Sequence, residues 1–346
     1  MMTKITLAQP IYDQLMHHGS ISTTVHSVFN AACNLQSPFG LISLLTQPKK
    51  MNPSAILLPQ GVSLKSLIVG AKVELCVINN KDSNLSPESA ASAHIDNLIL
   101  HINLGAGATI VSEQIARFNP SLPTALPIAL SQQSSLQLHI ASFLQCNQKS
   151  LGIYPLLCQQ PRLNIATNLV YQPEMMIKYI TPHLQKFIAA VAQQDRAIEL
   201  KFIIGFGAGL TPSMDDLLVG LLSWLDFSQH PYFYLLAQAV QASAAQTTDV
   251  SQAMLLHATH HRYNQEITEL YAFLNQPFNP CALDVALDTV IAYGHSSGHD
   301  TLCGIYLGLI FFGDAPISWK HATGADVEWC SIVLMYLLDH AYSGQL

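Results

Sequence analysis

Charged residues are scarce in this sequence of 346 residues: Asp, Glu, Lys and Arg make up 11% of it, whereas half of the residues are hydrophobic. Such a composition predicts extensive burial, either inside large domains or at subunit interfaces. Only 15 residues are Lys or Arg, the formal net charge is −7, and no segment concentrates the basic residues. This pattern argues against a nucleic-acid-binding protein.

Long hydrophobic runs are also missing. No apolar run reaches the ~18–20 residues that cross a bilayer, and the apolar segment 304–313 is short enough to indicate a buried helix. The N-terminal residues show neither the apolar core nor the small-residue cleavage site of a signal peptide. We therefore expect a cytoplasmic protein that does not contact a membrane.

Cysteine pairs with metal-binding spacing are absent. The seven cysteines include no Cys-x-x-Cys motif and lie mostly in apolar contexts. They are Cys33, Cys76, Cys146, Cys158, Cys281, Cys303 and Cys330. We interpret them as reduced thiols of the core, and a zinc cluster is disfavoured.

The two halves of the chain differ in their hydrophobic pattern, which predicts an α+β protein with a β-rich N-terminal domain and a mainly helical C-terminal domain. Short strand-like runs separated by Pro, Gly and Asn predict the first domain over residues 1–107, with a helix at 86–97. The predicted strands are 22–29, 40–46, 54–58, 72–78 and 98–104. Long helices do not alternate with these strands, which argues against a doubly wound sheet.

Helical patterns dominate the rest of the chain. Residues 108–180 form a predicted connecting region with helices at 109–119 and 134–147 and an irregular stretch at 148–173. Residues 181–346 form the predicted helical domain. Its helices are expected near 181–195, 213–227, 231–245, 250–274, 280–293, 297–312 and 325–341.

The segment "GFGAGLTPSMDDLLVG" (205–220) is the strongest local motif. It is not a dinucleotide fingerprint, because Leu210 or Pro212 stands where the third glycine should be. It is not a Walker loop either, because no lysine lies between Lys201 and Lys320. Capping offers a purely structural alternative, since Ser213 and Asp216 fit a capping box, or Thr211 could cap a helix with Pro212 in its first position.

Capping does not explain Asp215 or the glycines. Gly205, Gly207 and Gly209 allow positive φ and a close approach to a ligand, and the N-terminus of the helix that follows favours an anion. Two carboxylates in the same turn would repel an anion unless a cation or a donor-rich substrate lies between them.

A second segment, "YGHSSGHDTLCGIYLG" (293–308), repeats the pattern Ser-x-x-Asp-x-x-x-Gly. Aligning Asp216 with Asp300 also aligns Ser213 with Ser297 and Gly220 with Gly304. Glycine inside a helix costs roughly 1 kcal/mol relative to alanine, so we expect these glycines to allow close helix packing. The expected result is one cleft, formed by Asp215, Asp216, Asp300, Ser213, Ser296, Ser297, His295 and His299 together with the glycine loop and Thr211.

Several kinds of chemistry fit this cleft. The three aspartates could hold Mg²⁺, although nothing in the sequence requires a cofactor. Alternatively, a carboxylate could bind an amide or carbamoyl NH₂ while helix N–H groups hold a phosphate or carboxylate. His295 or His299 could transfer a proton, whereas the Ser-Ser-Gly between them disfavours a zinc site. The cluster His257, His260 and His261 more simply indicates a solvated helix face.

The motif 205–220 resembles the signature Gly-x-Gly-x-Gly-Leu-Thr-Pro-Ser-Gly-Asp-Asp-x-Leu-x-Gly of a bacterial family that includes the AllH-type subunit of oxamate carbamoyltransferase. Residues 294–308 resemble its second signature and "VHSVFNAACNL" (25–35) its N-terminal one. Met214 departs from the pattern, where glycine is common. The polar residues of 25–35 could line a domain interface, or they could only form buried hydrogen bonds.

The resemblance implies a subunit of a hetero-oligomeric transferase of allantoin and purine catabolism, which makes oxalurate and phosphate from oxamate and carbamoyl phosphate. The glycine loop would then bind an anion, and Asp215, Asp216, Asp300 and His295 would be its candidate catalytic residues. The Ser-x-Arg-Thr-Arg motif of ordinary transcarbamoylases is absent, and the chain has four arginines. Alternatives are a non-catalytic metabolite-binding subunit and a Mg²⁺-dependent hydrolase that uses the aspartates.

Overall fold

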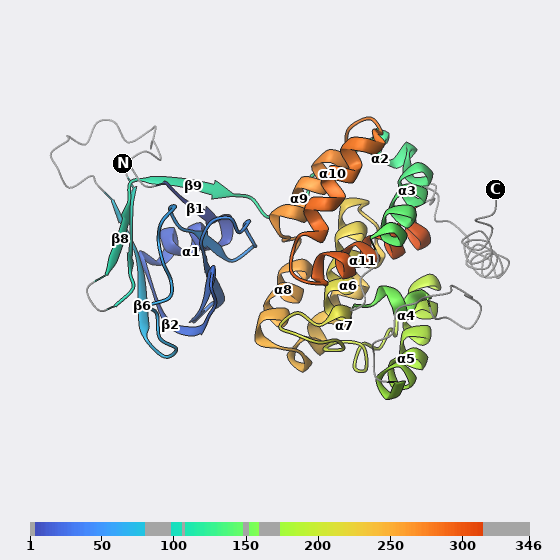
Figure 1. The fold of residues 1–346 in the computed structure, drawn as a ribbon, viewed down its shortest axis with the longest axis horizontal. Helices are drawn as coiled ribbons and strands as arrows, with labels where there is room; N and C mark the ends of the chain where they lie inside the picture. Colours follow the sequence, from blue (N-terminus) through green and yellow to red (C-terminus); the bar gives the residue numbers. More distant parts are fainter. Residues whose placement is uncertain (1–3, 80–97, 106–107, 148–151, 159–173, 314–346) are drawn as a thin grey trace. The chain divides into compact units, whose positions relative to one another are not determined.

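The structure, a computed structural model, describes residues 4–79, 98–105, 108–147, 152–158 and 174–313 (Figure 1). The chain divides into two compact units: residues 1–121 with Tyr263–Gln265, and residues 122–262 with 266–346. The first unit is rich in strands and the second is mainly helical. The predicted α+β class, with the β-rich part first, is therefore confirmed.

A mixed sheet of nine described strands forms the first unit, in the order β8-β7-β6-β2-β3-β4-β5-β1-β9. Most neighbouring strands are antiparallel, whereas β1 with β9 and β4 with β5 are parallel. The strands are β1 (Lys4–Ala8), β2 (Ser20–Val28), β3 (Ala32–Ser37), β4 (Gly40–Leu45), β5 (Ala55–Leu57), β6 (Lys72–Asn79), β7 (Leu98–Asn103), β8 (Thr109–Ser112) and β9 (Gln114–Phe118).

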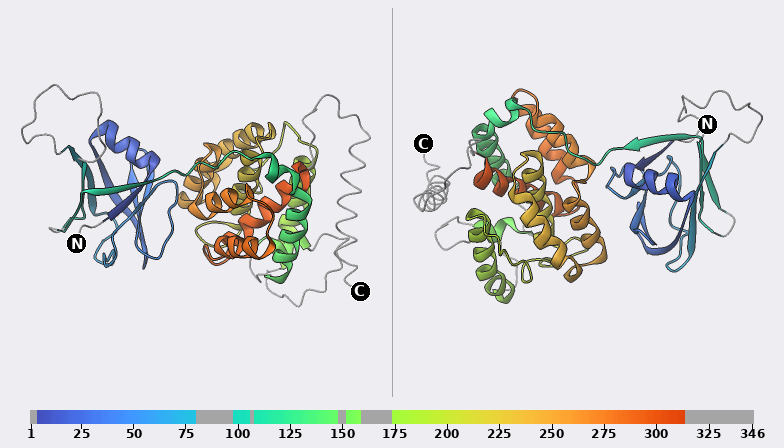
Figure 2. Two further views of the ribbon diagram at one scale, coloured as in Figure 1. Left: turned by 90° about the horizontal axis from the view of Figure 1, so that it is seen from above. Right: turned by 180° about the vertical axis from the view of Figure 1, so that it is seen from behind.

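The core of this unit lies between the sheet and helix α1 (Gln9–His18), which runs along one face of the sheet (Figure 2). Ile11 and Leu15 of α1 are buried in the same cluster as Ile21 and Val25 of β2. Buried and exposed residues alternate along β2, as expected for a strand with one face on the core. Neither β1 nor α1 is among the elements predicted from the sequence.

Residues 109–119, predicted as a helix of the connecting region, are β8 and β9 instead. β8 pairs with β7 and β9 pairs with β1, so both belong to the sheet of the first unit. The Ser112 hydroxyl donates to the Gln114 carbonyl (3.0 Å) and accepts from the Gln114 N–H (3.2 Å). Such local side-chain bonds compete with helical hydrogen bonding, and β-branched Thr109, Ile110 and Val111 favour a strand.

The second unit is built from helices. They are α2 (Pro127–Ser131), α3 (Gln133–Cys146), α4 (Tyr154–Cys158), α5 (Glu174–Ala192), α6 (Ser213–Phe227), α7 (Tyr232–Ser243), α8 (Asp249–Thr259), α9 (Gln265–Leu274), α10 (Pro280–Ile291) and α11 (Ser297–Phe312), with a 3₁₀ turn at Ala244–Gln246. The predictions for 134–147, 213–227, 231–245, 280–293 and 297–312 match these helices closely. The predicted helices 86–97 and 325–341 lie outside the described residues.

Two helix predictions were wrong in extent. The predicted helix 250–274 is split into α8 and α9, because His261 takes a positive φ of 60° that a right-handed helix does not allow. His261 stacks on Phe233, with ring centroids 4.4 Å apart, so the three histidines do not form one solvated face. Helix α5 begins well before Thr181 and contains Pro182.

Helices α6 and α11 pack backbone against backbone at the centre of the second unit. A Cβ placed on Gly220 would lie 2.0 Å from the Thr301 carbonyl oxygen, and one on Gly304 would lie 2.0 Å from the Leu217 carbonyl oxygen. No other residue type fits such contacts. The close packing predicted from Gly220 and Gly304 is therefore confirmed.

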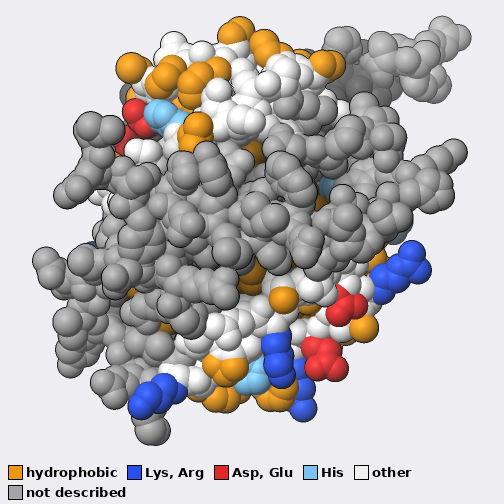
Figure 3. All heavy atoms as spheres, turned by 90° about the vertical axis from the view of Figure 1, so that its right-hand side faces the viewer, with side chains coloured by type: hydrophobic (Ala, Val, Ile, Leu, Met, Phe, Trp, Pro, Cys, Tyr) orange, Lys and Arg blue, Asp and Glu red, His pale blue; other side chains and the backbone are white. Residues whose placement is uncertain are grey.

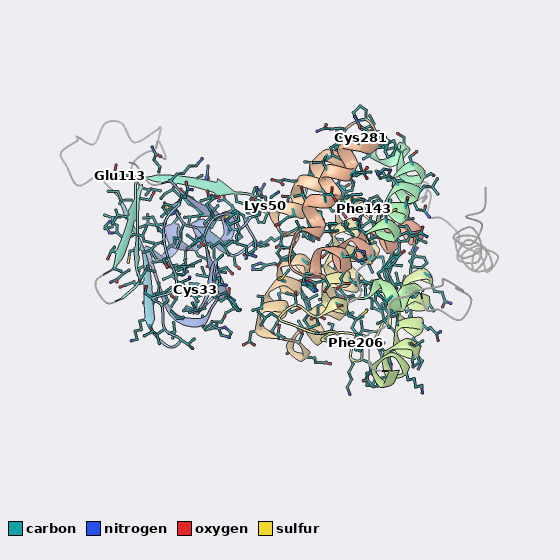
Figure 4. The ribbon with its side chains drawn as sticks, viewed as in Figure 1. Cys33, Lys50, Glu113, Phe143, Phe206 and Cys281 are labelled. Carbon is teal, nitrogen blue, oxygen red and sulfur yellow. The ribbon has the colours of Figure 1, made fainter. Side chains whose placement is uncertain are left out.

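Not all cysteines are core thiols. Cys33 and Cys303 are buried, but Cys146 and Cys281 are exposed, which corrects the sequence-based interpretation. Figure 4 shows Cys33 within the first unit and Cys281 at one end of α10. Among the described residues, these four cysteines and Cys76 form no disulfide bond.

Hydrophobic side chains are exposed on parts of the helical unit. On the face in Figure 3, hydrophobic side chains gather at the upper end, whereas the Lys and Arg side chains lie at the lower end among hydrophobic and acidic ones. Ile128 of α2 and Leu138 of α3 are among the exposed large hydrophobic residues. Within the described residues, no helix is both long enough and apolar enough to cross a membrane.

We expect Gly304→Ala to destabilise the protein by about 2 kcal/mol or more, because the added methyl group must push two helix backbones apart. Thermal or denaturant unfolding followed by circular dichroism measures this loss. Gly61→Ala is the control: its Cβ meets nothing within 4 Å, so only the backbone strain of its positive φ counts. Equal stability losses for the two variants would contradict the packing described here.

Candidate functional site

The glycine loop turns back onto the start of α6. Gly205, Gly207 and Gly209 all have positive φ, of 79°, 131° and 97°. A Cβ on Gly207 would lie 2.3 Å from the Ser213 nitrogen, so this turn needs glycine for space as well as for conformation. The Met214 N–H donates to the Phe206 carbonyl (3.0 Å), which fixes the loop to the helix.

Capping does not account for the polar residues of this motif. The N-cap position of α6 is Pro212, no side chain caps the helix, and Ser213 is already its first residue. The Thr211 hydroxyl instead pairs with the Ser297 hydroxyl at the start of α11 (2.8 Å). The capping-box interpretation was therefore wrong, and the two glycine-containing motifs meet at their hydroxyl groups.

Both carboxylate oxygens of Asp215 accept hydrogen bonds from the protein. Its Oδ1 accepts from the Gly205 N–H (2.8 Å), and its Oδ2 accepts from the hydroxyls of Ser251 (2.7 Å) and Thr247. Burial raises the pKa of Asp215, and the bonds from Ser251, Thr247 and Gly205 oppose that rise. Asp215 thus holds the glycine loop against the N-terminal end of α8.

Asp216 lies in the next position but faces α11. It is 2% exposed. Burial raises its pKa well above the usual value, the charge of Asp300 raises it further, and the hydroxyls of Ser297 and Thr211 counteract both effects. The charge of Asp300 therefore acts on Asp216, as expected for carboxyl groups in one buried region.

Asp300 is fully buried in the first turn of α11. Its Oδ1 accepts the Ile153 N–H (2.7 Å), and Gly152 is so close that a Cβ there would lie 2.5 Å from this oxygen. Burial raises the pKa of Asp300 to about 7, although Ile153, Ser213 and Ser296 oppose the rise with hydrogen bonds. A carboxyl group with such a pKa can give or take a proton near neutral pH.

The two histidines of the second motif are separated. His299 is buried in α11, with its ring edge-to-face with Tyr154 (centroids 5.3 Å apart) and its Nδ1 3.9 Å from the Cys303 sulfur. His295 is exposed and precedes the helix. They do not lie on one helix face, so the structure gives no support to a zinc site between them.

The aspartates do not assemble into a metal centre either. In the described part of the chain, no group of three or more His, Cys, Asp or Glu side chains is placed to hold a metal ion. Asp215 already uses both oxygens for hydrogen bonds to the protein. A Mg²⁺ site built from Asp215, Asp216 and Asp300 is therefore not favoured.

Four residues that hold the site together were not identified from the sequence: Gly152, Ile153, Thr247 and Ser251. Ile153 contributes only its backbone N–H, for which no side-chain pattern exists. Thr247 and Ser251 flank the recognisable cap of α8, where the Thr248 hydroxyl accepts the Ser251 N–H (3.1 Å). Their link to Asp215 depends on tertiary packing alone.

The third polar segment, 25–35, belongs to the first unit. The Asn34 amide donates to the Ser27 hydroxyl (3.2 Å), and the Ser43 hydroxyl donates to the Asn34 carbonyl oxygen (3.0 Å). The Ser27 hydroxyl also lies 3.2 Å from Nδ1 of His26. Internal hydrogen bonding across β2, β3 and β4 thus involves His26, Ser27 and Asn34 of this segment.

Both units of the chain match models of the same protein family. The family described as oxamate carbamoyltransferase subunit AllH matches residues 203–309, and the AllH family N-terminal domain matches residues 3–95. The chain belongs to the AllH family. The match 203–309 contains the glycine loop and all three aspartates, and the family description associates the chain with a carbamoyltransferase as one of its subunits. No solved structure matches the chain.

We expect Asp215→Ala to lower the free energy of unfolding by about 2–4 kcal/mol, because three donors would lose a buried charged acceptor. Equilibrium denaturation measures the loss. Asp249→Ala serves as the control, since it removes an exposed aspartate from the first turn of α8 and should cost less than about 1 kcal/mol. A similar small loss for Asp215→Ala would contradict the role given to this side chain.

A second prediction concerns pH. The pKa of Asp300 is about 7 in the folded chain, against an ordinary value of 3.8, so between these values the folded state holds a proton that the unfolded state lacks. Its contribution to stability is present at low pH and is lost as pH rises through this window. The Asp300→Asn variant has no carboxyl group at this position and does not lose stability in this way. Its free energy of unfolding relative to that of the wild type should therefore rise as the pH increases through the window, by up to about 1.4 kcal/mol per pH unit. A difference independent of pH would contradict the raised pKa.

Proposed function

We propose that this chain is a subunit of a carbamoyltransferase complex that transfers the carbamoyl group of carbamoyl phosphate to a small acyl-amide such as oxamate. The observation that carries the proposal is the buried pair Asp216 and Asp300, with raised pKa values, beside the glycine loop. Family membership supports the carbamoyltransferase association.

An amide nitrogen is a weak nucleophile and must lose a proton during transfer. In the proposed step, the oxamate nitrogen attacks the carbonyl carbon of carbamoyl phosphate, an N–C bond forms, and the C–O bond to phosphate breaks. The N–H proton passes to a carboxylate of the site, and phosphate leaves. A carboxyl group with a pKa near 7 suits this task at neutral pH, because general bases are most effective near the working pH.

The glycine loop suits an anion. Among the described residues, the N–H groups of Gly207, Ala208, Gly209 and Leu210 donate to no acceptor. These N–H groups lie directly before the N-terminus of α6, whose dipole also favours negative charge. We assign the phosphate of carbamoyl phosphate, or the carboxylate of oxamate, to this loop.

The chain offers few cations for phosphate binding, because no lysine lies between Lys201 and Lys320 and there are four arginines in the sequence. Phosphoryl-bearing substrates are normally bound with the help of Arg or Lys. We therefore infer that partner subunits supply the cations, which fits a hetero-oligomeric enzyme. A metabolite-binding subunit without turnover is the second candidate, favoured by the burial of both carboxylates, at 2% and 0% exposure.

Co-purification of the chain with the products of neighbouring genes, followed by an assay of phosphate release and oxalurate formation, tests the proposal. Asp216→Asn should lower kcat of the assembled complex by about 100-fold or more, the usual contribution of a positioned acid or base. Asp288→Asn, which removes an exposed aspartate from α10, is the control and should leave kcat unchanged. Full activity of the Asp216→Asn complex would favour the metabolite-binding alternative.

A further inference from the structure

Two buried carboxyl oxygens of the helical unit have no hydrogen-bond donor among the described residues: Oδ2 of Asp216 and Oδ2 of Asp300. Both belong to the first turns of helices whose backbones touch. A buried carboxylate oxygen without a donor is strongly unfavourable. Two of them in one place call for a common explanation.

Local symmetry relates the two carboxyl groups. Gly220 of α6 lies against the Thr301 carbonyl, and Gly304 of α11 lies against the Leu217 carbonyl. In the alignment that pairs Asp216 with Asp300, Gly220 corresponds to Gly304. Leu217 likewise corresponds to Thr301. Replacing each residue of one contact by its counterpart therefore gives the other contact. The helices are thus related by a local pseudo-twofold axis.

The hydroxyl groups follow the same symmetry. Ser297 of α11 lowers the pKa of Asp216 on α6 by hydrogen bonding, and Ser213 of α6 does the same for Asp300 on α11. Each carboxyl group is therefore supported by the serine of the other helix. Asp216 and Asp300 occupy equivalent positions about this axis, and the charge of Asp300 raises the pKa of Asp216, so the two carboxyl groups lie within electrostatic reach of each other.

We infer that Asp216 and Asp300 hold one proton in common, in a carboxyl–carboxylate hydrogen bond between their Oδ2 atoms, and that this dyad is both the base and the acid of the carbamoyl transfer. The shared proton is inferred from the two orphan oxygens and the local symmetry, whereas its catalytic role rests on the proposed function. One proton gives both orphan oxygens a partner and avoids placing two negative charges side by side, as in other paired carboxyl groups.

A singly protonated dyad balances the reaction. Its ionised member takes the proton from the attacking amide nitrogen, and its protonated member gives a proton to the leaving phosphate oxygen. The dyad then again holds one proton, so no net proton is gained or lost at the site. The half-buried Thr211 hydroxyl bonds to Ser297 beside Asp216, which links the dyad to the surface by a chain of hydroxyl groups.

NMR of the full chain, labelled with ¹³C at the aspartate carboxyl carbons, tests the shared proton directly. Asp216→Asn and Asp300→Asn assign the two signals, and Asp288→Asn serves as the assignment control. We expect both signals to respond to the same two titration steps, one of them near neutral pH, as coupled sites do. We also expect Asp300→Asn to lower the apparent pKa of Asp216 by more than about one unit, because a like charge is removed.

Two carboxyl groups that titrate independently near the ordinary aspartate value would overturn the dyad. The wild-type titration decides this point even where a variant fails to fold. For the catalytic role, the assembled wild-type complex should give a bell-shaped pH profile of kcat whose two limbs match the titration steps of the dyad.

The two proposals fail in different ways. A shared proton without any carbamoyl transfer by the assembled complex would leave the dyad in place and remove its catalytic role together with the proposed function. Turnover by the wild-type complex with two independent carboxyl groups would remove the dyad and leave the proposed function in place.

Discussion

The contact between the backbones of α6 and α11 is the constraint on which the rest of the helical unit depends. Gly220 and Gly304 let each helix lie against a carbonyl group of the other. Because the helices touch one turn after Asp216 and Asp300, the two carboxyl groups are brought together and removed from water. Their raised pKa values are therefore a consequence of helix packing, and the packing is a consequence of two glycines.

The two adjacent aspartates, Asp215 and Asp216, differ in their hydrogen bonding. Asp215 uses both oxygens to hold the glycine loop and the start of α8, whereas Asp216 keeps one oxygen without a protein donor among the described residues. Consecutive helical positions point about 100° apart, so neighbouring identical side chains meet different surroundings. Asp215 therefore has a structural role, whereas Asp216 is the member of the pair to which the proposed function assigns chemistry.

Much of this architecture could be predicted from the chain. The α+β class, the helices around 213–227 and 297–312, and the pairing of Asp216 with Asp300 follow from local pattern, because glycine and apolar spacing report directly on helix contacts. The strands β8 and β9 could not be predicted, since 109–118 lacks clear alternation and its state depends on partners β7 and β1. Capping failed as an explanation for a similar reason: Thr211 bonds across to Ser297 rather than to its own helix.

The hydrogen bond from Ile153 to Asp300 joins positions 147 residues apart in the sequence. Contacts with such separation close a long loop, which costs entropy and slows folding. Asp300 gains this donor only when the segment before α4 docks onto α11. The surroundings of Asp300 are thereby coupled to the packing of distant parts of the unit, so a partly folded chain would contain both motifs without the buried environment of this carboxyl group.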